Sequence, residues 1–150
     1  MLSTTFDKLK EHGACESGYK KLATALGGAT KYGRTTRISL LVILESNGVD
    51  DCTWALRAAV EPERDYLARM IGADCAESVL HLFTAVRPND DRPMAAIQAA
   101  RAFARGEIDE STWDAAWDAA WAAAGDAAWD AAWDAEREKQ AVIIKSWLTA

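Results

Sequence analysis

The chain has few of the residues that catalytic and metal sites most often use. Its 150 residues include two histidines, His12 and His81, and three cysteines, Cys15, Cys52 and Cys75. Neither histidine has a Cys, Asp or Glu at the spacing of a metal site, and no cysteine stands in a CxxC pattern or next to a base. We therefore expect no metal centre, no catalytic thiol and no bound cofactor.

The sequence also lacks the short motifs that bind nucleotides or present a nucleophile, because it contains no GxxxxGKS/T, GxGxxG or GxSxG pattern. Two adjacent acid pairs, at residues 50–51 and 90–91, could hold Mg²⁺ or act in acid–base chemistry. Each pair also stands where a helix is expected to begin, and an aspartate there caps the free N–H groups of the first turn. Capping is therefore the preferred interpretation of Asp50, Asp51, Asp90 and Asp91, and a metal-dependent enzyme is kept as a third hypothesis.

Long apolar runs are missing as well. The run ISLLVIL, at residues 38–44, is too short to span a bilayer. The first residues, MLSTTFDKLKEHG, have no apolar stretch long enough for a signal peptide. An odd number of widely spaced cysteines favours a reducing compartment. We expect a soluble, cytoplasmic protein that does not contact a membrane.

Negative charge is concentrated in the second half of the chain. The formal net charge is −6, and residues 1–69 contain ten Lys and Arg against nine Asp and Glu, whereas residues 70–150 contain seven against fourteen. Residues 107–138 alone hold ten acids and one base. Such a segment repels a phosphate backbone and attracts a basic surface, so we expect no direct binding of nucleic acid. The basic cluster of Lys31, Arg34 and Arg37 has no aromatic platform beside it and is interpreted as a solvated loop.

The stretch TWDAAWDAAWAAAGDAAWDAAWDA, residues 112–135, departs most from an average sequence. Tryptophan occupies every fourth position except one, which Gly125 fills. Aspartate follows four of the tryptophans and the glycine, and alanine, the best helix former, fills the rest. The tryptophans are Trp113, Trp117, Trp121, Trp129 and Trp133, and the aspartates are Asp114, Asp118, Asp126, Asp130 and Asp134. The pattern predicts a helix with a tryptophan row beside an aspartate row.

We expect most of this tryptophan row to be buried, because an indole ridge with a four-residue period suits helices that cross at about −50°. The aspartate row is then left for solvent or for a partner. A helix uninterrupted from Ser111 to Leu148 would be roughly 57 Å long, whereas a compact domain of this size is only about 40 Å across. Either the helix bends at Gly125, or one end projects, or a second subunit covers the excess in a homodimer.

The rest of the chain also has helical patterns and no convincing pair of strands. Helices are expected within residues 3–11, 14–28, 38–48, 50–59, 63–72, 73–86 and 92–105, with a break or a kink at Gly72 between the fifth and the sixth. The run at residues 38–44 could form a buried strand, but the ending ESNG is typical of a helix C-terminus. We predict an all-α fold, a single-domain helical bundle over residues 1–150 with about seven helices and a long Ala/Trp/Asp-rich C-terminal helix.

Two segments carry a resemblance to a known family. They are DCTWALRAA, around residues 52–59, and GADCAESVLHLFTAVRPNDDRPMAAIQAARAFARGEI, at residues 72–108, and the alanine-rich helix follows them. Together, over roughly residues 48–135, they resemble the immunity-protein-like domain that is the fifth type in the polymorphic-toxin immunity series of bacteria and phages. The start GACxxGY, at residues 13–19, is similar to phage-encoded members. The resemblance implies a small, non-catalytic helical protein that binds and neutralises another protein.

The leading hypothesis is a non-enzymatic inhibitor of a protein target, either a toxin or a host defence complex. It would be an immunity protein or a phage counter-defence protein of the anti-CRISPR kind, in the latter case in the host cytoplasm. Its acidic C-terminal helix would meet a basic, nucleic-acid-handling surface. The alternative is a structural or assembly protein that self-associates through the tryptophan-rich helix. The residues expected to bind the partner are Asp114, Asp118, Asp126, Asp130, Asp134, Glu136, Glu138, Trp129 and Trp133.

Overall fold

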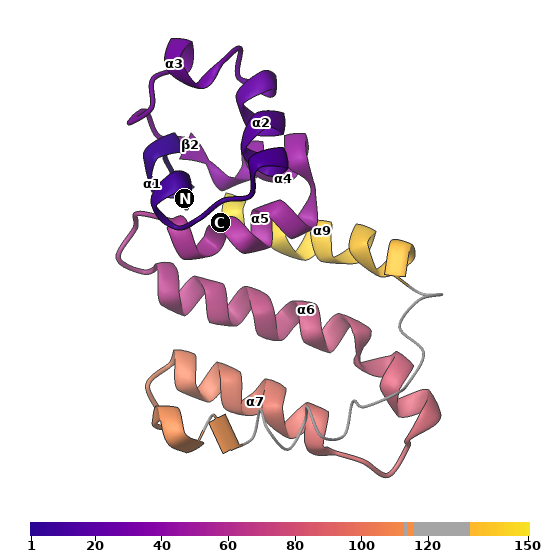
Figure 1. The fold of residues 1–150 in the computed structure, drawn as a ribbon. Helices are drawn as coiled ribbons and strands as arrows, with labels where there is room; N and C mark the ends of the chain where they lie inside the picture. The colour runs from indigo at the N-terminus through magenta and orange to yellow at the C-terminus, as the bar shows by residue number, and fades with distance from the viewer. Residues whose placement is uncertain (113, 116–132) are drawn as a thin grey trace. The chain divides into compact units, whose positions relative to one another are not determined.

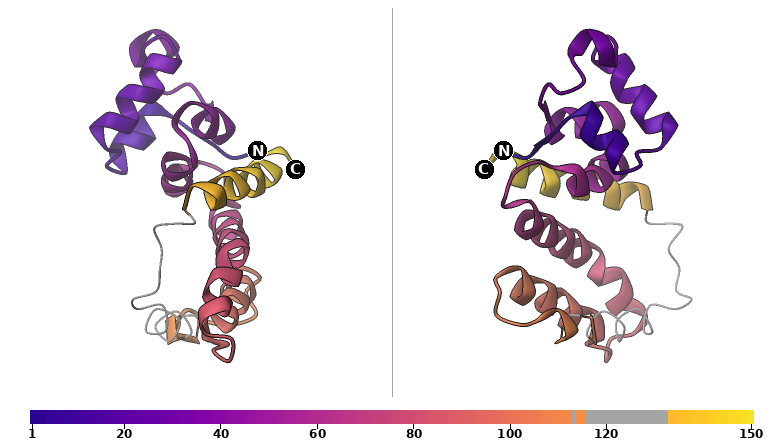
Figure 2. Two further views of the ribbon diagram at one scale, coloured as in Figure 1. Left: turned by 90° about the vertical axis from the view of Figure 1, so that its right-hand side faces the viewer. Right: turned by 60° about the vertical axis from the view of Figure 1, so that its left-hand side comes forward.

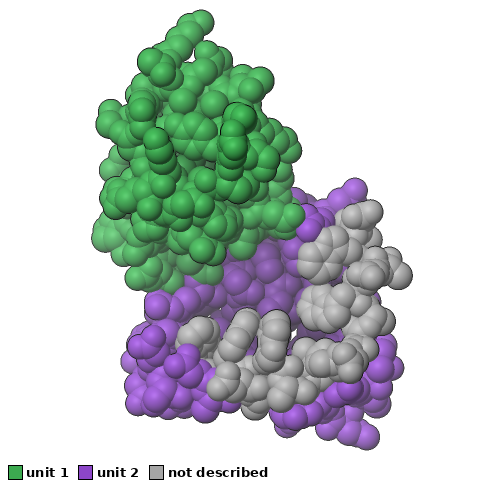
Figure 3. Space-filling model, in the orientation of Figure 1, with its two compact units in different colours: residues 1–68, 144–150 green, residues 69–143 purple. Residues whose placement is uncertain are grey.

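The computed structural model describes residues 1–112, 114–115 and 133–150. The chain divides into two compact units, shown in different colours in Figure 3: unit 1 is Met1–Ala68 with Ile144–Ala150, and unit 2 is Arg69–Ile143. The two units are described separately below. The single domain expected over residues 1–150 stays a prediction.

The described residues are predominantly helical, which confirms the predicted all-α class. Unit 1 contains α1 (Phe6–Glu11), α2 (Glu16–Ala25), α3 (Ala29–Tyr32), α4 (Leu40–Asn47), α5 (Val49–Ala55) and the 3-10 helix η1 (Leu56–Ala58), together with the strands β1 (Ser3–Thr4) and β2 (Ile38–Ser39), as Figure 1 shows. Helix α7 (Arg92–Ala104) belongs to unit 2, and α6 (Arg64–Val86) and α9 (Trp133–Thr149) each contribute residues to both units. Within the described residues, no helix is long and apolar enough to cross a membrane.

The expectation that no strands pair was wrong. Strands β1 and β2 form a two-residue antiparallel pair in which Ser3 lies opposite Ser39 and Thr4 opposite Ile38. The first helix therefore begins at Phe6 rather than at Ser3, and the side chain of Thr5 caps it by accepting a hydrogen bond from the Lys8 N–H at 3.1 Å. The extended N-terminus is stabilised by partners that lie far away in the sequence.

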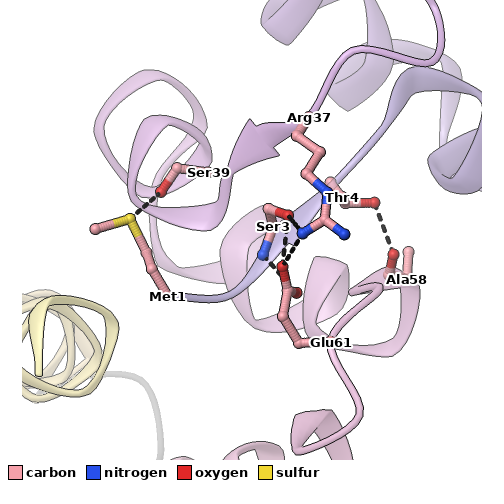
Figure 4. A network of polar contacts seen from close by, with 7 residues as sticks. All are labelled: Met1, Ser3, Thr4, Arg37, Ser39, Ala58 and Glu61. Atoms are coloured by element: carbon pink, nitrogen blue, oxygen red, sulfur yellow. Dashed lines mark hydrogen bonds and ion pairs between the residues drawn. The ribbon is translucent and has the colours of Figure 1, made fainter.

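Those partners form the polar network in Figure 4, which centres on Glu61. The Ser3 N–H donates to Glu61 Oε2 at 2.8 Å, and the Ser3 hydroxyl donates to Glu61 Oε1 at 2.6 Å. The Arg37 guanidinium reaches the same Oε1 at 3.0 Å. Burial opposes ionisation of Glu61, but the hydrogen bonds from Ser3 and the charge of Arg37 outweigh it and hold the pKa of Glu61 below its ordinary value.

The apolar run at residues 38–44 is mainly the helix that its ending predicted. Helix α4 begins at Leu40, and Ser39 caps it by accepting from the Leu41 N–H at 3.2 Å. Leu40 and Ile43 are fully or almost fully buried. The helix ends before Gly48, whose φ of 99° lies in the left-handed region that glycine tolerates.

In unit 2, α6 and α7 lie side by side in the ribbons of Figures 1 and 2. The Arg101 guanidinium on α7 lies 2.6 Å from a carboxylate oxygen of Asp74 and 2.6 Å from one of Glu77, both on α6. The Arg69 guanidinium lies over the Phe103 ring at 4.5 Å from its centroid. Two arginines, one on each helix, therefore fasten this helix pair.

Three features of these helices bear on what was expected from the sequence. Of the break or kink expected at Gly72, the break is absent, because helix α6 continues through this residue. Apolar residues at positions 79, 82, 83 and 86 recur at helical spacing on α6, but this face is only partly covered, since Leu82 and Val86 are exposed. Of the two aspartates expected to cap α7, Asp91 holds the N-cap position without a side-chain hydrogen bond, and Asp90 does the capping by accepting from the Arg92 N–H at 3.2 Å.

Candidate functional site

Of the nine residues predicted to bind a partner, the structure describes the side chains of Asp114, Glu136 and Glu138. The others lie outside the described side chains; they are Asp118, Asp126, Asp130, Trp129, Trp133 and Asp134. The buried and exposed faces assigned to the tryptophan and aspartate rows therefore stay predictions, as does a bend at Gly125.

The acidic segment of residues 107–138 begins with a helix cap. Asp109 Oδ1 accepts hydrogen bonds from the Thr112 N–H at 2.9 Å, the Thr112 hydroxyl at 2.7 Å and the Ser111 hydroxyl at 2.9 Å. These bonds, with that of the Thr112 side chain first, hold the pKa of Asp109 below its ordinary value. The cap confirms that a helix starts here, and Asp109 is the residue that provides it.

Solvent reaches several acids of this segment. Glu110, Asp114 and Glu138 are all exposed. Glu107 is exposed too, but the Arg105 guanidinium contacts both of its carboxylate oxygens, at 2.6 and 2.9 Å, and lowers the pKa of Glu107. Among the described acids of this segment, we therefore take Glu110, Asp114 and Glu138 as those whose negative charge is most available to a partner.

Glu136 differs from these acids because it is buried, with 6% of its surface exposed. Its Oε1 accepts from Lys139 Nζ at 2.6 Å and lies 3.6 Å from His81 Nε2. Its Oε2 is buried and has no hydrogen-bond partner among the described residues. This carboxylate is occupied within unit 2, so it is not counted below among the acids that face a partner.

The three cysteines lie in different surroundings. Cys15 is exposed and precedes α2, where its Sγ lies 3.4 Å from the Ser17 hydroxyl and accepts from the Gly18 N–H at 3.4 Å. These two contacts lower the pKa of the Cys15 thiol. Cys52 is buried, and burial raises the pKa of Cys75 to about 11. In the described part of the chain, no group of three or more His, Cys, Asp or Glu side chains could hold a metal ion.

Unit 1 contains a pocket that was not predicted from the sequence. It has a volume of about 260 Å³ and lies between α2, α4 and α5. Asp50 and Asp51, which the sequence analysis interpreted as caps, line this pocket instead. Helix α5 begins one residue earlier than predicted, after Gly48, and no side chain caps it. The glycine inside α2, Gly18, also lines the pocket, and a glycine within a helical pattern was the sequence signal that could have drawn attention to it.

A family model described as "Imm-5 like putative immunity protein" matches residues 58–141. The matched segment covers more than half of the chain and includes the whole acidic segment of residues 107–138. It begins and ends a few residues later than the resemblance seen in the sequence, and it leaves the pocket of unit 1 outside. Searches of curated proteins and of solved structures gave no match.

Proposed function

Because the chain belongs to the family of Imm-5 like immunity proteins, we propose that it binds and neutralises a protein partner and catalyses no reaction. An immunity protein acts by occupying a surface that its target needs. What it requires is therefore a surface complementary to that target rather than a set of reactive groups. The acidic segment is the feature of this chain that best meets the requirement.

The charge distribution supports the acidic segment as the binding surface. Unit 2 contains fourteen Asp and Glu against seven Lys and Arg, whereas unit 1 contains nine against ten. Residues 107–138 hold ten of those fourteen acids, or nine without the buried Glu136. Complementary charge steers two proteins together and selects the correct partner more than it adds affinity. The proposed partner surface is accordingly basic.

A surface that handles nucleic acid has this character, because it must neutralise phosphates with Lys and Arg. Carboxylates that recur every four residues on one helix follow one another at about 6 Å intervals along the axis. Such a row imitates the regular negative charge of a nucleic-acid backbone. We therefore infer that the target is a toxin whose basic groove binds nucleic acid, and that the acidic segment fills this groove.

Two other functions would give different experimental results. A counter-defence protein of the anti-CRISPR kind would use the same charge against a host defence complex, and a neighbouring toxin gene would argue against it. A self-associating structural protein would use the tryptophan-rich stretch, and it would form oligomers without any partner. Sedimentation over a wide concentration range separates that function from ours, because the inhibitor does not need to self-associate.

The test begins with capture of the partner from the natural host, using the full chain as bait. Affinity is then measured by calorimetry for the wild type and for a variant with four aspartates of the row reversed, Asp114→Lys, Asp118→Lys, Asp130→Lys and Asp134→Lys. We expect the captured partner to bind this variant at least tenfold more weakly, because like charges across an interface cost several kcal/mol.

A matched control reverses four exposed acids of unit 1, which lie outside the segment; they are Glu16→Lys, Glu45→Lys, Glu63→Lys and Asp65→Lys. Both variants change the net charge equally, so a general charge effect would weaken binding of both. We expect the control to bind nearly as well as the wild type. Unchanged affinity of the first variant, with its helix content intact by circular dichroism, would contradict the proposed function.

A further inference from the structure

The pocket of unit 1 combines an apolar interior with carboxylates. Leu9, Leu22 and Ile43 contribute to its lining and are buried, while Tyr19 and Trp54 add aromatic rings. Its volume of about 260 Å³ is below the roughly 300–1,000 Å³ that is usual for sites that hold a whole small molecule. The pocket therefore suits a single side chain better than a cofactor.

The carboxylate of Asp51 is held in place over α2. Asn47 Nδ2 donates to Asp51 Oδ2 at 2.6 Å and also lies 2.9 Å from the carbonyl oxygen of Gly18. A Cβ atom at position 18 would stand 2.7 Å from Asp51 Oδ2, which is closer than real Cβ atoms approach an oxygen. With any other residue at this position, the carboxylate would have to move away from the helix. The arrangement is a built feature of the pocket and not a loose surface charge.

An organic cation with an apolar stem matches this lining. Its charge would meet the carboxylates of Asp50 and Asp51, and its stem would lie against the leucines and the isoleucine. One guanidinium already lies over the Trp54 ring, because that of Arg57 is 5.2 Å from the ring centroid. Arg57 itself does not line the pocket. Guanidinium is favoured over ammonium because it is planar, stacks on aromatic rings and binds carboxylates with two parallel hydrogen bonds.

We propose that the pocket between α2, α4 and α5 receives an arginine side chain of the partner protein. This inference rests on the proposed function, because the arginine belongs to the protein partner that the proposed function requires. The pocket lies outside the segment that the family model matches, so it is a second contact, separate from the acidic segment. Arginine is among the residues that most often act as anchors at interfaces, where one side chain fills one pocket.

The first experiment uses the full chain and N-acetyl-arginine amide as the probe. Its backbone ends are blocked, so it presents only the side chain that a protein would present. Amide resonances are followed by NMR, and we expect saturable shifts at Gly18, Tyr19 and Asp51 with a Kd on the order of 1 mM, as the small size of the probe implies. N-acetyl-citrulline amide has nearly the same shape without the charge, and it should give no saturable shifts.

Two variants test the assigned carboxylate. Asp51→Asn removes the charge and should weaken binding of the probe at least about fivefold, because charge-assisted hydrogen bonds are roughly twice as strong as neutral ones. Gly18→Ala places a methyl group 2.7 Å from Asp51 Oδ2, so the carboxylate must shift, and this variant should weaken binding similarly. Alanine itself favours the helix. Glu16→Gln is the matched control, because it removes one exposed charge from the start of the same helix without touching the pocket.

Several results would overturn the assignment. They are the absence of saturable shifts, equal binding of the citrulline probe, or unchanged binding to both Asp51→Asn and Gly18→Ala. Tighter binding of free arginine than of the blocked probe would show that the pocket serves a small metabolite and not a protein side chain. With the captured partner, Asp51→Asn should lower affinity and Glu16→Gln should not.

The two proposals fail in different ways. The probe experiment contains no partner, so a negative result removes the pocket assignment and leaves the acidic segment to its own charge-reversal test. A partner that ignores reversal of the aspartate row would remove the proposed function even if the probe binds.

Discussion

Glu61 is expected to hold the N-terminal strand of unit 1 in place, and replacing it tests the structural account of that unit. The Glu61 side chain is 10% exposed and accepts hydrogen bonds from the Ser3 N–H, the Ser3 hydroxyl and Arg37. Glu61→Gln removes the negative charge and leaves one oxygen to accept. Hydrogen bonds to charged groups contribute about 1.5–3 kcal/mol, so we expect the variant to lose about 2 kcal/mol of unfolding free energy.

Arg37→Met provides the control for this prediction. The Arg37 side chain is 68% exposed, and exposed ion pairs contribute no more than about 1 kcal/mol. Urea unfolding gives the total loss for each variant. Hydrogen exchange at two amides shows whether the loss of stability lies at the N-terminal strand. The Leu40 N–H donates to the Leu2 carbonyl, and the Val60 N–H donates to the Ser3 carbonyl. Equal losses for both variants, or unchanged exchange at Leu40 and Val60, would refute the role assigned to Glu61.

The pH dependence follows from the lowered pKa of Glu61. A carboxyl group whose pKa is lower in the folded protein stabilises the fold above its unfolded pKa, near 4.5, and this stabilisation is lost as the pH falls through the folded pKa. The difference in stability between wild type and Glu61→Gln should therefore be constant at neutral pH and shrink below about pH 4.5. A difference that grows on acidification would contradict the sign of this shift.

Three further predictions follow from other contacts. Arg101→Ala should destabilise unit 2 by about 1–3 kcal/mol and speed hydrogen exchange in α7. The reason is that the Arg101 guanidinium bridges two carboxylates of α6 and its side chain is only 23% exposed. The control Arg105→Ala should change little, because the ion-pair partner of Arg105 is only two residues away on the chain. Iodoacetamide should label Cys15 first and Cys75 much later as the pH rises from 7 to 9, since the pKa of Cys15 is lowered and that of Cys75 raised to about 11; mass spectrometry showing faster labelling of Cys75 would contradict this order. Gly18→Ala should change the rate of Cys15 labelling, because the added Cβ would stand 3.2 Å from its Sγ, and an unchanged rate would contradict that packing.

Local patterns in the sequence predicted most of the helices. The run at residues 38–44 was assigned to a helix, correctly from Leu40 onward, because the segment that follows it ends at Gly48, which the helix needs in the left-handed region. The strand pair could not be predicted, because two residues carry no periodicity. What fixes Ser3 in an extended conformation is Glu61, which is 58 residues away.

The candidate sites show the same limit. The acidic segment could be found by counting charges, and the cap at its start depends only on hydrogen bonds from Ser111 and Thr112 to the nearby Asp109. The burial of Glu136 could not be predicted, because His81 approaches it from a helix far earlier in the chain. The pocket was missed for a similar reason. The pattern placed Asp51 near a helix start, but it lies close to Gly18 only because α2 and α5 both pack on α4, whose Asn47 bonds to both residues.

The central claim is that the acidic segment of residues 107–138 brings the chain to a basic partner. It is tested most directly by the rate constant of association with the captured partner, measured at several salt concentrations for the wild type and for the variant with four reversed aspartates. We predict that the wild type associates much faster at low salt and that the two rates converge as salt increases, because salt screens charges at the rim of an interface. Equal rates and equal salt dependence for the two proteins would contradict the claim.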